Sequence, residues 1–186
     1  MIKIESLKDY VGKISTNEFM YLANEIYQII DSIGEDYPKH KEWYFNKQLP
    51  AITSDERNIL FVRNPDNPKE ILAMACLKKD REEQKICTLY VSDKYRGLGI
   101  GTSLIETSMN WLLTTKPLIT ITEYKLEMFD AIIKKYNWEL TDIVTGLYND
   151  RYKELCYNGT LLKKEELATK LVRLLNKRKE DLKSFK

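Results

Sequence analysis

The stretch from Lys85 to Leu113, KICTLYVSDKYRGLGIGTSLIETSMNWLL, constrains the fold more than any other part of the chain. It begins with an alternation of β-branched, aromatic and apolar residues, which predicts a strand covered on both faces. A polar break at residues 92–95 and a glycine-rich loop at residues 96–101 follow. The next residues recur at the spacing of one helical face, namely Leu104, Ile105, Ser108, Met109 and Leu112. The sequence therefore predicts a buried strand, a tight loop and an amphipathic helix, in that order.

A loop in this position suits a phosphate group. The start of a helix leaves backbone N–H groups without internal partners, and the helix dipole adds positive potential there. Gly97, Gly99 and Gly101 lack the Cβ atoms that would hinder the approach of phosphate oxygens, and Arg96 adds a charge with several donors. We therefore predict that residues 96–102 bind a phosphate-bearing ligand. The alternative is a surface turn that merely needs glycine.

Two common phosphate-binding patterns do not fit this loop. A P-loop needs Gly-Lys-Ser/Thr at the helix start, whereas Gly101 is followed by Thr102 and Ser103. The dinucleotide fingerprint has two residues between its second and third glycines, whereas only Ile100 separates Gly99 from Gly101.

The Arg-x-x-Gly-x-Gly pattern of Arg96, Gly99 and Gly101 instead resembles the pyrophosphate loop of the GNAT superfamily of acyl-CoA-dependent N-acyltransferases. The preceding Leu89-Tyr90-Val91 is similar to the strand end that runs beside the pantetheine arm in that family. The resemblance implies that acetyl-CoA is a co-substrate. The implied binding residues are Leu89, Tyr90, Val91, Arg96, Gly97, Leu98, Gly99, Ile100, Gly101 and Thr102.

The composition is that of a globular protein with one domain over residues 1–186. Hydrophobic residues make up 43% and charged residues 31% of the chain. No apolar run is long enough to span a membrane, and the N-terminus lacks a secretion-signal pattern, so we expect a cytoplasmic protein without a membrane partner. Three isolated cysteines and a single histidine predict reduced thiols and no metal site.

The remaining patterns predict an element order that is similar to that of the GNAT fold over residues 1–159. A capping box at Ser15 and Glu18 starts a helix that is expected to run to Gly34. The other expected helices are 39–47, 126–136 and 161–185, and the expected strands are 2–7, 58–63, 70–77, 85–91, 117–122, 139–148 and 151–157. We therefore expect an α/β (α+β) fold with a mixed, mostly antiparallel twisted sheet of about seven strands, flanked by helices. Residues 160–186 would add a basic amphipathic helix.

The resemblance also implies positions for acid and base catalysis, and this chain departs from them. Many relatives carry a carboxylate where this chain has Cys87, and a tyrosine where it has Ile133. Tyr124, just past the strand at 117–122, is the candidate replacement acid, with helix-start packing as the alternative. Cys87 is expected to be a small buried side chain rather than a nucleophile.

Three residues of the predicted second helix are candidates for the acceptor side. Trp43 and Tyr44 are expected either to line the acceptor pocket, because the helices there border it in relatives, or to pack in the core. His40 could accept a proton, but its Lys/Glu-rich surroundings favour a solvated surface residue.

The expected function is transfer of an acetyl group from acetyl-CoA to a primary amine, by direct attack in a ternary complex. The alternative is a non-catalytic acyl-CoA-binding module, which the departures at Cys87 and Ile133 motivate. The segment from Lys163 to Lys186 contains nine basic and four acidic residues. This basic segment could form a homodimer contact. It also suggests that the acceptor could be a charged tRNA or a ribosomal protein. The formal charge of +2 says little about partners, and nucleic acid is not an expected one, because no aromatic residue lies among the basic residues of this segment before Phe185.

Overall fold

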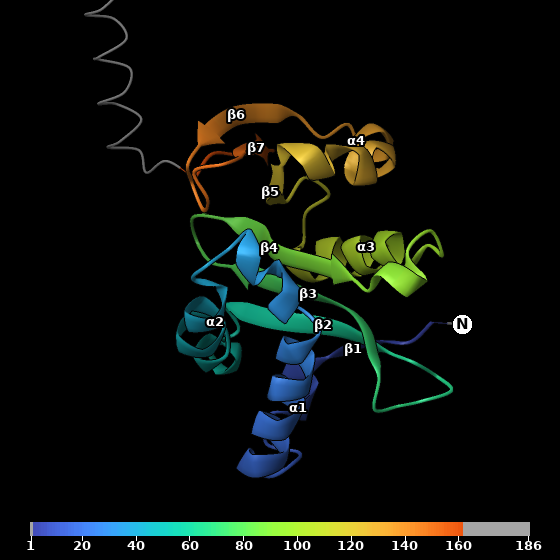
Figure 1. Ribbon diagram of the computed structural model, residues 1–186. Helices are drawn as coiled ribbons and strands as arrows, with labels where there is room; N and C mark the ends of the chain where they lie inside the picture. The colour runs from blue at the N-terminus through green and yellow to red at the C-terminus, as the bar shows by residue number, and fades with distance from the viewer. Residues whose placement is uncertain (1, 162–186) are drawn as a thin grey trace, which may run out of the picture.

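The computed structural model describes residues 2–161, and the predicted C-terminal helix lies outside them. Within these residues the chain forms one sheet of seven strands in the order β1-β2-β3-β4-β5-β7-β6 (Figure 1). Every neighbouring pair is antiparallel except β4 and β5, which are parallel. The strands are β1 (Ile4–Ser6), β2 (Arg57–Arg63), β3 (Ile71–Lys79), β4 (Gln84–Val91), β5 (Leu118–Thr122), β6 (Leu140–Thr145) and β7 (Lys153–Tyr157). This confirms the expected mixed, mostly antiparallel sheet.

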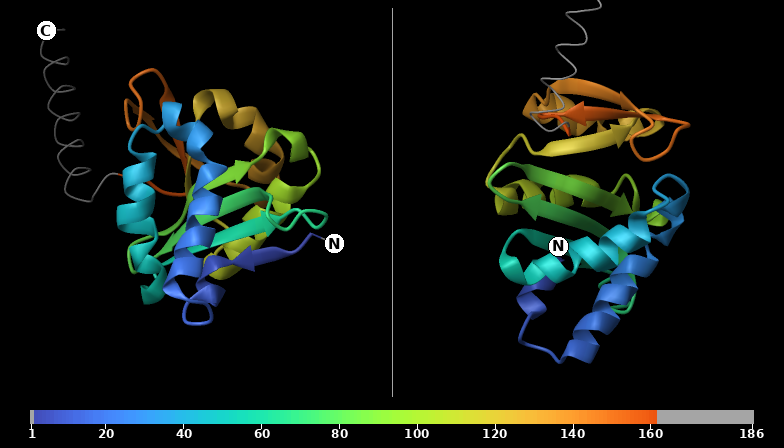
Figure 2. Two further views of the ribbon diagram at one scale, coloured as in Figure 1. Left: turned by 60° about the horizontal axis from the view of Figure 1, so that its bottom comes forward. Right: turned by 90° about the vertical axis from the view of Figure 1, so that its left-hand side faces the viewer.

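Helices cover both faces of the sheet (Figure 2). The α-helices are α1 (Thr16–Gln28), α2 (His40–Trp43), α3 (Ile100–Leu112) and α4 (Asp130–Tyr136). One hydrophobic core joins α3 and α4 to the sheet, and a second core joins α1 and the segment around α2 to the opposite face. The alternation of β2 divides its side chains between the two, since Ile59 and Phe61 belong to one core and Leu60 and Val62 to the other. The continuous apolar runs of β2 and β3 thus reflect burial on both faces.

The expected helix from the capping box is shorter than predicted. Ser15 and Glu18 form the capping box as expected, but α1 ends at Gln28 rather than near Gly34. Residues 31–35 form a 3₁₀ turn instead. The reason is local, because Ile29, Ile30, Asp31 and Ser32 have low helix propensity. The Asp31 carboxylate also accepts a hydrogen bond from the Tyr27 hydroxyl, at 3.0 Å.

Other boundaries also differ from the expectation. The predicted helix 39–47 is a short α-helix followed by a π-helical turn at 44–48 and a 3₁₀ turn at 50–54. The predicted helix 126–136 begins as a 3₁₀ segment, Glu123–Phe129, before α4. The connection between β6 and β7 is longer than the predicted two-residue turn, because the strands end at Thr145 and resume at Lys153.

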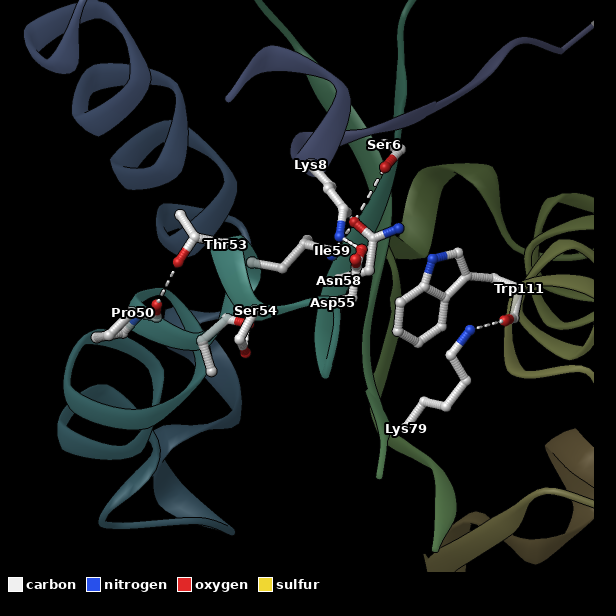
Figure 3. Close-up of polar contacts among 11 residues, drawn as sticks. Ser6, Lys8, Pro50, Thr53, Ser54, Asp55, Asn58, Ile59, Lys79 and Trp111 are labelled. Atoms are coloured by element: carbon white, nitrogen blue, oxygen red, sulfur yellow. Dashed lines mark hydrogen bonds and ion pairs between the residues drawn. The ribbon is translucent and has the colours of Figure 1, made fainter. Parts of the chain in front are cut away.

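Two polar contacts fix how the strands meet their neighbours (Figure 3). The buried Asn58 side chain on β2 accepts hydrogen bonds through Oδ1 from the Ser6 hydroxyl, at 3.0 Å, from the Ile59 N–H, at 2.8 Å, and from the Lys8 N–H, at 3.4 Å. Near the same end of these strands, the Lys79 ammonium donates to the Trp111 carbonyl at 3.0 Å. A cation near the C-terminus of a helix is favoured by the helix dipole, so this contact holds the end of α3 against β3.

The Asn58 contacts generate a stability prediction. Asn58→Ala should lower the free energy of unfolding by about 1–3 kcal/mol, because three donors lose a buried acceptor. Urea denaturation monitored by circular dichroism measures the change. Ser6→Ala, which removes only one donor, should have a smaller effect. Equal stability of Asn58→Ala and the wild type would contradict this account.

Candidate active site

The strands β4 and β5 diverge after a short contact. Only two residue pairs join them, Lys85 with Leu118 and Ile86 with Ile119. Beyond that point residues 87–91 of β4 are only half-buried, although β4 lies in the middle of the sheet. Figure 2 shows the two strands separating in its right-hand view. In the described part of the chain, the last residues of β4 therefore have no strand partner on the β5 side.

A β-bulge lies where the divergence begins. Thr88 pairs with Cys76 and Ile86 with Leu77, so Cys87 has no direct partner on β3. A bulge bends its strand and re-aims the side chains on either side of it. The Cys87 sulfur lies 4.0 Å from an Arg57 guanidinium nitrogen. Burial nevertheless raises the pKa of the Cys87 thiol, which keeps it protonated and favours the expected packing role.

The glycine loop follows β4 and leads into α3. Gly97 and Gly99 have positive φ angles, 78° and 79°, and Gly99 is the N-cap of α3. A Cβ atom built on either residue would meet no other atom within 4 Å, so both residues face open space. The first N–H groups of α3, on Ile100, Gly101 and Thr102, lack partners within the helix. The loop therefore combines open access with unpaired donors and the positive end of a helix dipole.

Arg96 is held within the loop rather than extended from it. Its guanidinium lies 2.7 Å from the Asp93 carboxylate, and its Nε donates to the Val91 carbonyl at 3.2 Å. The Asp93 carboxylate compensates part of the positive charge that Arg96 was predicted to offer to a phosphate group. In this conformation Arg96 shapes the loop, and direct contact with phosphate stays a prediction. Leu98 is 65% exposed beside it.

Tyr124, the predicted acid, belongs to a polar cluster just past β5. Its hydroxyl donates to the Asp36 carboxylate, and the Lys125 ammonium lies 2.8 Å from the same carboxylate. Burial and the hydrogen bond to Asp36 raise the pKa of Tyr124. Burial alone would raise the pKa of Asp36, but the hydrogen bonds from Lys125 and Tyr124 outweigh it and lower that pKa. The arrangement makes Tyr124 a reluctant proton donor.

The predicted acceptor residues are mostly packed in the core. Tyr44 is fully buried, and its hydroxyl donates to the Ala23 carbonyl at 2.9 Å. Trp43 is half-buried, with the Arg57 guanidinium 5.8 Å from its ring. The expectation of a solvated His40 is wrong, because His40 is 7% exposed and its ring stacks on Tyr27. Its aromatic neighbours bury it, and this burial lowers the pKa of His40 to about 4.

Sequence reasoning missed a buried carboxylate on β7. Glu154 is 4% exposed, and its Oε1 accepts a hydrogen bond from the Thr122 hydroxyl at 2.8 Å. The Tyr37 hydroxyl lies 2.9 Å from the same Thr122 oxygen. A signal was present, since Glu154 and Cys156 occupy alternate positions of an apolar strand and therefore share one inward face. Ile133, by contrast, packs against the core and offers no titratable group.

The sequence of the chain matches a known protein family. The model of the acetyltransferase (GNAT) family matches residues 18–122, more than half of the chain. The chain therefore belongs to the GNAT family of acetyltransferases. The match includes both diverging strands and the glycine loop. A comparison with curated protein sequences found no match.

Solved structures share the fold at low sequence identity. An acetyltransferase of the GNAT family from Bacillus cereus is 16% identical, with a TM-score of 0.56 over 88% of this chain and 99% of that one. NAA60 of Arabidopsis thaliana, in complex with a bisubstrate analogue, is 14% identical, with a TM-score of 0.58 over 84% and 96%. Nourseothricin acetyltransferase is 14% identical with a TM-score of 0.48, and the match covers 55% of this chain but only 64% of that one. These likenesses concern the fold.

Residues 2–161 contain neither a candidate metal site nor a candidate membrane-spanning helix. No group of three or more His, Cys, Asp or Glu side chains there is placed to hold a metal ion. None of the helices described is long and apolar enough to cross a membrane.

The loop geometry generates a binding prediction. Gly99→Val should weaken CoA binding at least about tenfold, because the side chain would extend into the open space beside the unpaired N–H groups. Isothermal titration calorimetry with CoA measures the change. The matched control is Gly12→Val, since Gly12 also has a positive φ angle, 74°, and open space around it, but lies in a turn between residues 10 and 13. Equal CoA affinity of the two variants would show that the loop does not bind the diphosphate.

Proposed function

We propose that this protein transfers an acetyl group from acetyl-CoA to a primary amine, with both substrates bound at once. The observation that carries the proposal is the divergence of β4 from β5 directly beside the glycine loop. The divergence leaves backbone groups of β4 unpaired on one side, and the loop offers donors for a diphosphate a few residues later. A ligand with a diphosphate at one end and an amide-bearing arm at the other matches this order of features.

The residues present fit acetyl-CoA at both ends. The N–H groups of Ile100, Gly101 and Thr102 would hold the diphosphate, since no Cβ atom at Gly97 or Gly99 hinders its approach. The backbone of Leu89 and Val91 would hold the amides of the pantetheine arm, with Tyr90 and Leu98 beside it. A backbone N–H of β4 at this point would polarise the thioester carbonyl towards attack.

Direct attack by the amine is the chemistry that this site supports. The protein would hold the amine and the thioester carbon close together, remove a proton from the amine and let the thiolate leave. A covalent intermediate on Cys87 is not favoured, because burial raises the pKa of its thiol. Both substrates must therefore be bound before acetyl transfer begins.

Tyr124 fits the role of acid poorly. It lies just past β5, where the thiolate would leave, but its hydroxyl would first have to release Asp36. Because the pKa of Tyr124 is raised, its proton is held more tightly than a thiolate would hold it. In the mechanism that we favour, the thiolate takes its proton from the attacking nitrogen, and Tyr124 orders the Asp36–Lys125 pair.

A non-catalytic acyl-CoA-binding module is the second candidate. It is favoured by the absence of a base at Cys87 and of an acid at Ile133. Such a module would use the same loop and the same divergence of strands, so only a reaction distinguishes the two candidates.

Release of free thiol from acetyl-CoA distinguishes the candidates. An enzyme should release CoA in proportion to the added amine when tested against primary amines, including small alkylamines, polyamines and lysine-containing peptides. Mass spectrometry should find the acetylated amine in equal amount. CoA binding by calorimetry without thiol release across this panel would favour the binding module.

Direct attack generates a kinetic prediction. Cys87→Ala should retain kcat within about threefold of the wild type, and plots of reciprocal rate at several amine concentrations should intersect, as expected for a ternary complex. Cys156→Ala, which removes a buried thiol on β7, is the control for lost packing. Parallel plots together with a loss of activity confined to Cys87→Ala would instead indicate an acetyl-cysteine intermediate.

A further inference from the structure

Glu154 is a buried carboxylate with one of its two oxygens unpaired within residues 2–161. It lies on β7 with 4% of its surface exposed, and only its Oε1 is hydrogen-bonded, to Thr122. Its Oε2 is buried and has no hydrogen-bond partner within residues 2–161. A buried carboxylate with an unpaired oxygen is unfavourable for stability, so this position suggests a role other than packing.

The hydrogen bonds around Glu154 have a defined direction. The single proton of the Thr122 hydroxyl is donated to Glu154, so this hydroxyl can only accept from its other neighbour. The Tyr37 hydroxyl, 2.9 Å away, is therefore the donor to Thr122. The relay from Tyr37 through Thr122 to Glu154 orients the carboxylate through one oxygen, and within residues 2–161 the other oxygen has no partner.

Glu154 lies beside the diverging strands. It pairs directly with Thr122, the last residue of β5, so their side chains share one face of the sheet. Ile121 and Leu155, their neighbours, belong to the core under α3 and α4. Glu154 is therefore on the opposite face, the face on which Cys87 and Tyr90 of β4 pack.

An open hollow lies beyond Tyr37, the first residue of this relay. The Tyr37 ring packs edge-on against Tyr148, with ring centroids 5.1 Å apart. Tyr148 in turn lines an open hollow of about 690 Å³. The Asn149 side chain donates to the Glu35 carbonyl at 3.1 Å, which ties the β6–β7 connection to the N-terminal segment along the hollow.

The charges around the hollow and around Glu154 favour a cation. Two carboxylates and one guanidinium line the hollow, whereas Asp36, Lys125 and Glu154 are not part of its lining. The acidic residues are Glu35, Asp36, Asp150 and Glu154, against the basic residues Lys85, Lys125 and Arg151. The aromatic faces of Tyr37 and Tyr148 add a surface that attracts an ammonium group.

We propose that Glu154 is the base that takes a proton from the acceptor, and that the acceptor is a cationic primary amine. This inference rests on the proposed acetyl transfer. One N–H bond of the ammonium breaks and its proton moves to Glu154, which leaves a neutral amine. The amine nitrogen then bonds to the thioester carbon, the C–S bond breaks, and the second proton of the nitrogen moves to the thiolate. Glu154 finally releases its proton to solvent, so one proton is produced per acetyl group transferred.

The surroundings of Glu154 match this role. Burial raises the pKa of Glu154, and the negative charge of Asp36 adds to the rise. The hydrogen bond from Thr122 and the positive charges of Lys125 and Lys85 oppose it without cancelling it. A base works best when its pKa approaches the working pH, and it acts only when ionised. Activity towards a cationic amine should therefore rise with pH through the pKa of Glu154.

Ethylamine and trifluoroethylamine form a matched pair of probes, because the first is an ammonium ion at pH 7 and the second is already a neutral amine. Glu154→Gln should lower kcat/KM for ethylamine at pH 7 by about 10²–10⁴-fold. That activity should recover about tenfold per pH unit, as the neutral fraction of ethylamine grows. For trifluoroethylamine the loss should be at least tenfold smaller.

Controls separate this role from a structural one. CoA affinity by calorimetry should be the same in Glu154→Gln as in the wild type. Glu139→Gln removes an exposed carboxylate that is paired with Lys116, and it should leave both amines unaffected. If Glu154→Gln does not fold, Thr122→Val removes the hydrogen bond that orients Glu154 and should give the same pattern with a smaller loss, whereas Thr122→Ser should retain activity.

The outcomes distinguish this inference from the proposed function. If the wild type acetylates ethylamine at pH 7 and Glu154→Gln retains that activity, the inference is overturned and the acetyl transfer stands. An equal loss with both amines, independent of pH, would also overturn it, because this pattern indicates misplacement rather than a missing base. Failure of the wild type to acetylate any primary amine would overturn the proposed function and the role of Glu154 with it.

Discussion

The proposed site depends on the brief contact between β4 and β5. A parallel pair of strands in the middle of a sheet would normally continue its hydrogen bonds along its whole length. Here β3 holds β4 on one side and β7 holds β5 on the other, so each strand is fixed although the two share only two residue pairs. The unpaired edge of β4 is therefore part of the stable fold, and it lies next to the start of α3.

The features that the sequence predicted well are local ones. The loop from Arg96 to Thr102, the capping box at Ser15 and the order of the elements all depend on neighbouring residues, and the structure has them in the expected places. The burial of His40 and Tyr44 was not predictable in the same way. It depends on aromatic neighbours such as Tyr27, which approach only when α1 and α2 pack together.

Glu154 marks the limit of sequence reasoning for the site. Its inward position can be read from the alternation of β7, but the partners that give it a direction lie far along the chain. Thr122 is contributed by β5, and Tyr37 by the segment that follows α1. Tyr124, the residue favoured from sequence, donates to Asp36, and burial and this hydrogen bond raise its pKa. Such partners become visible only when distant segments of the chain are placed in space.

The two-pair junction has a mechanical consequence. The strands β1 to β4 and the strands β5 to β7 are each continuous, whereas the seam between them is short. A sheet with such a seam bends there more easily than elsewhere. The seam would therefore act as a hinge between the two halves of the sheet, with Ile86 and Ile119 at the hinge position. A molecule wedged into the seam would stiffen the whole sheet, and its departure would restore the flexing.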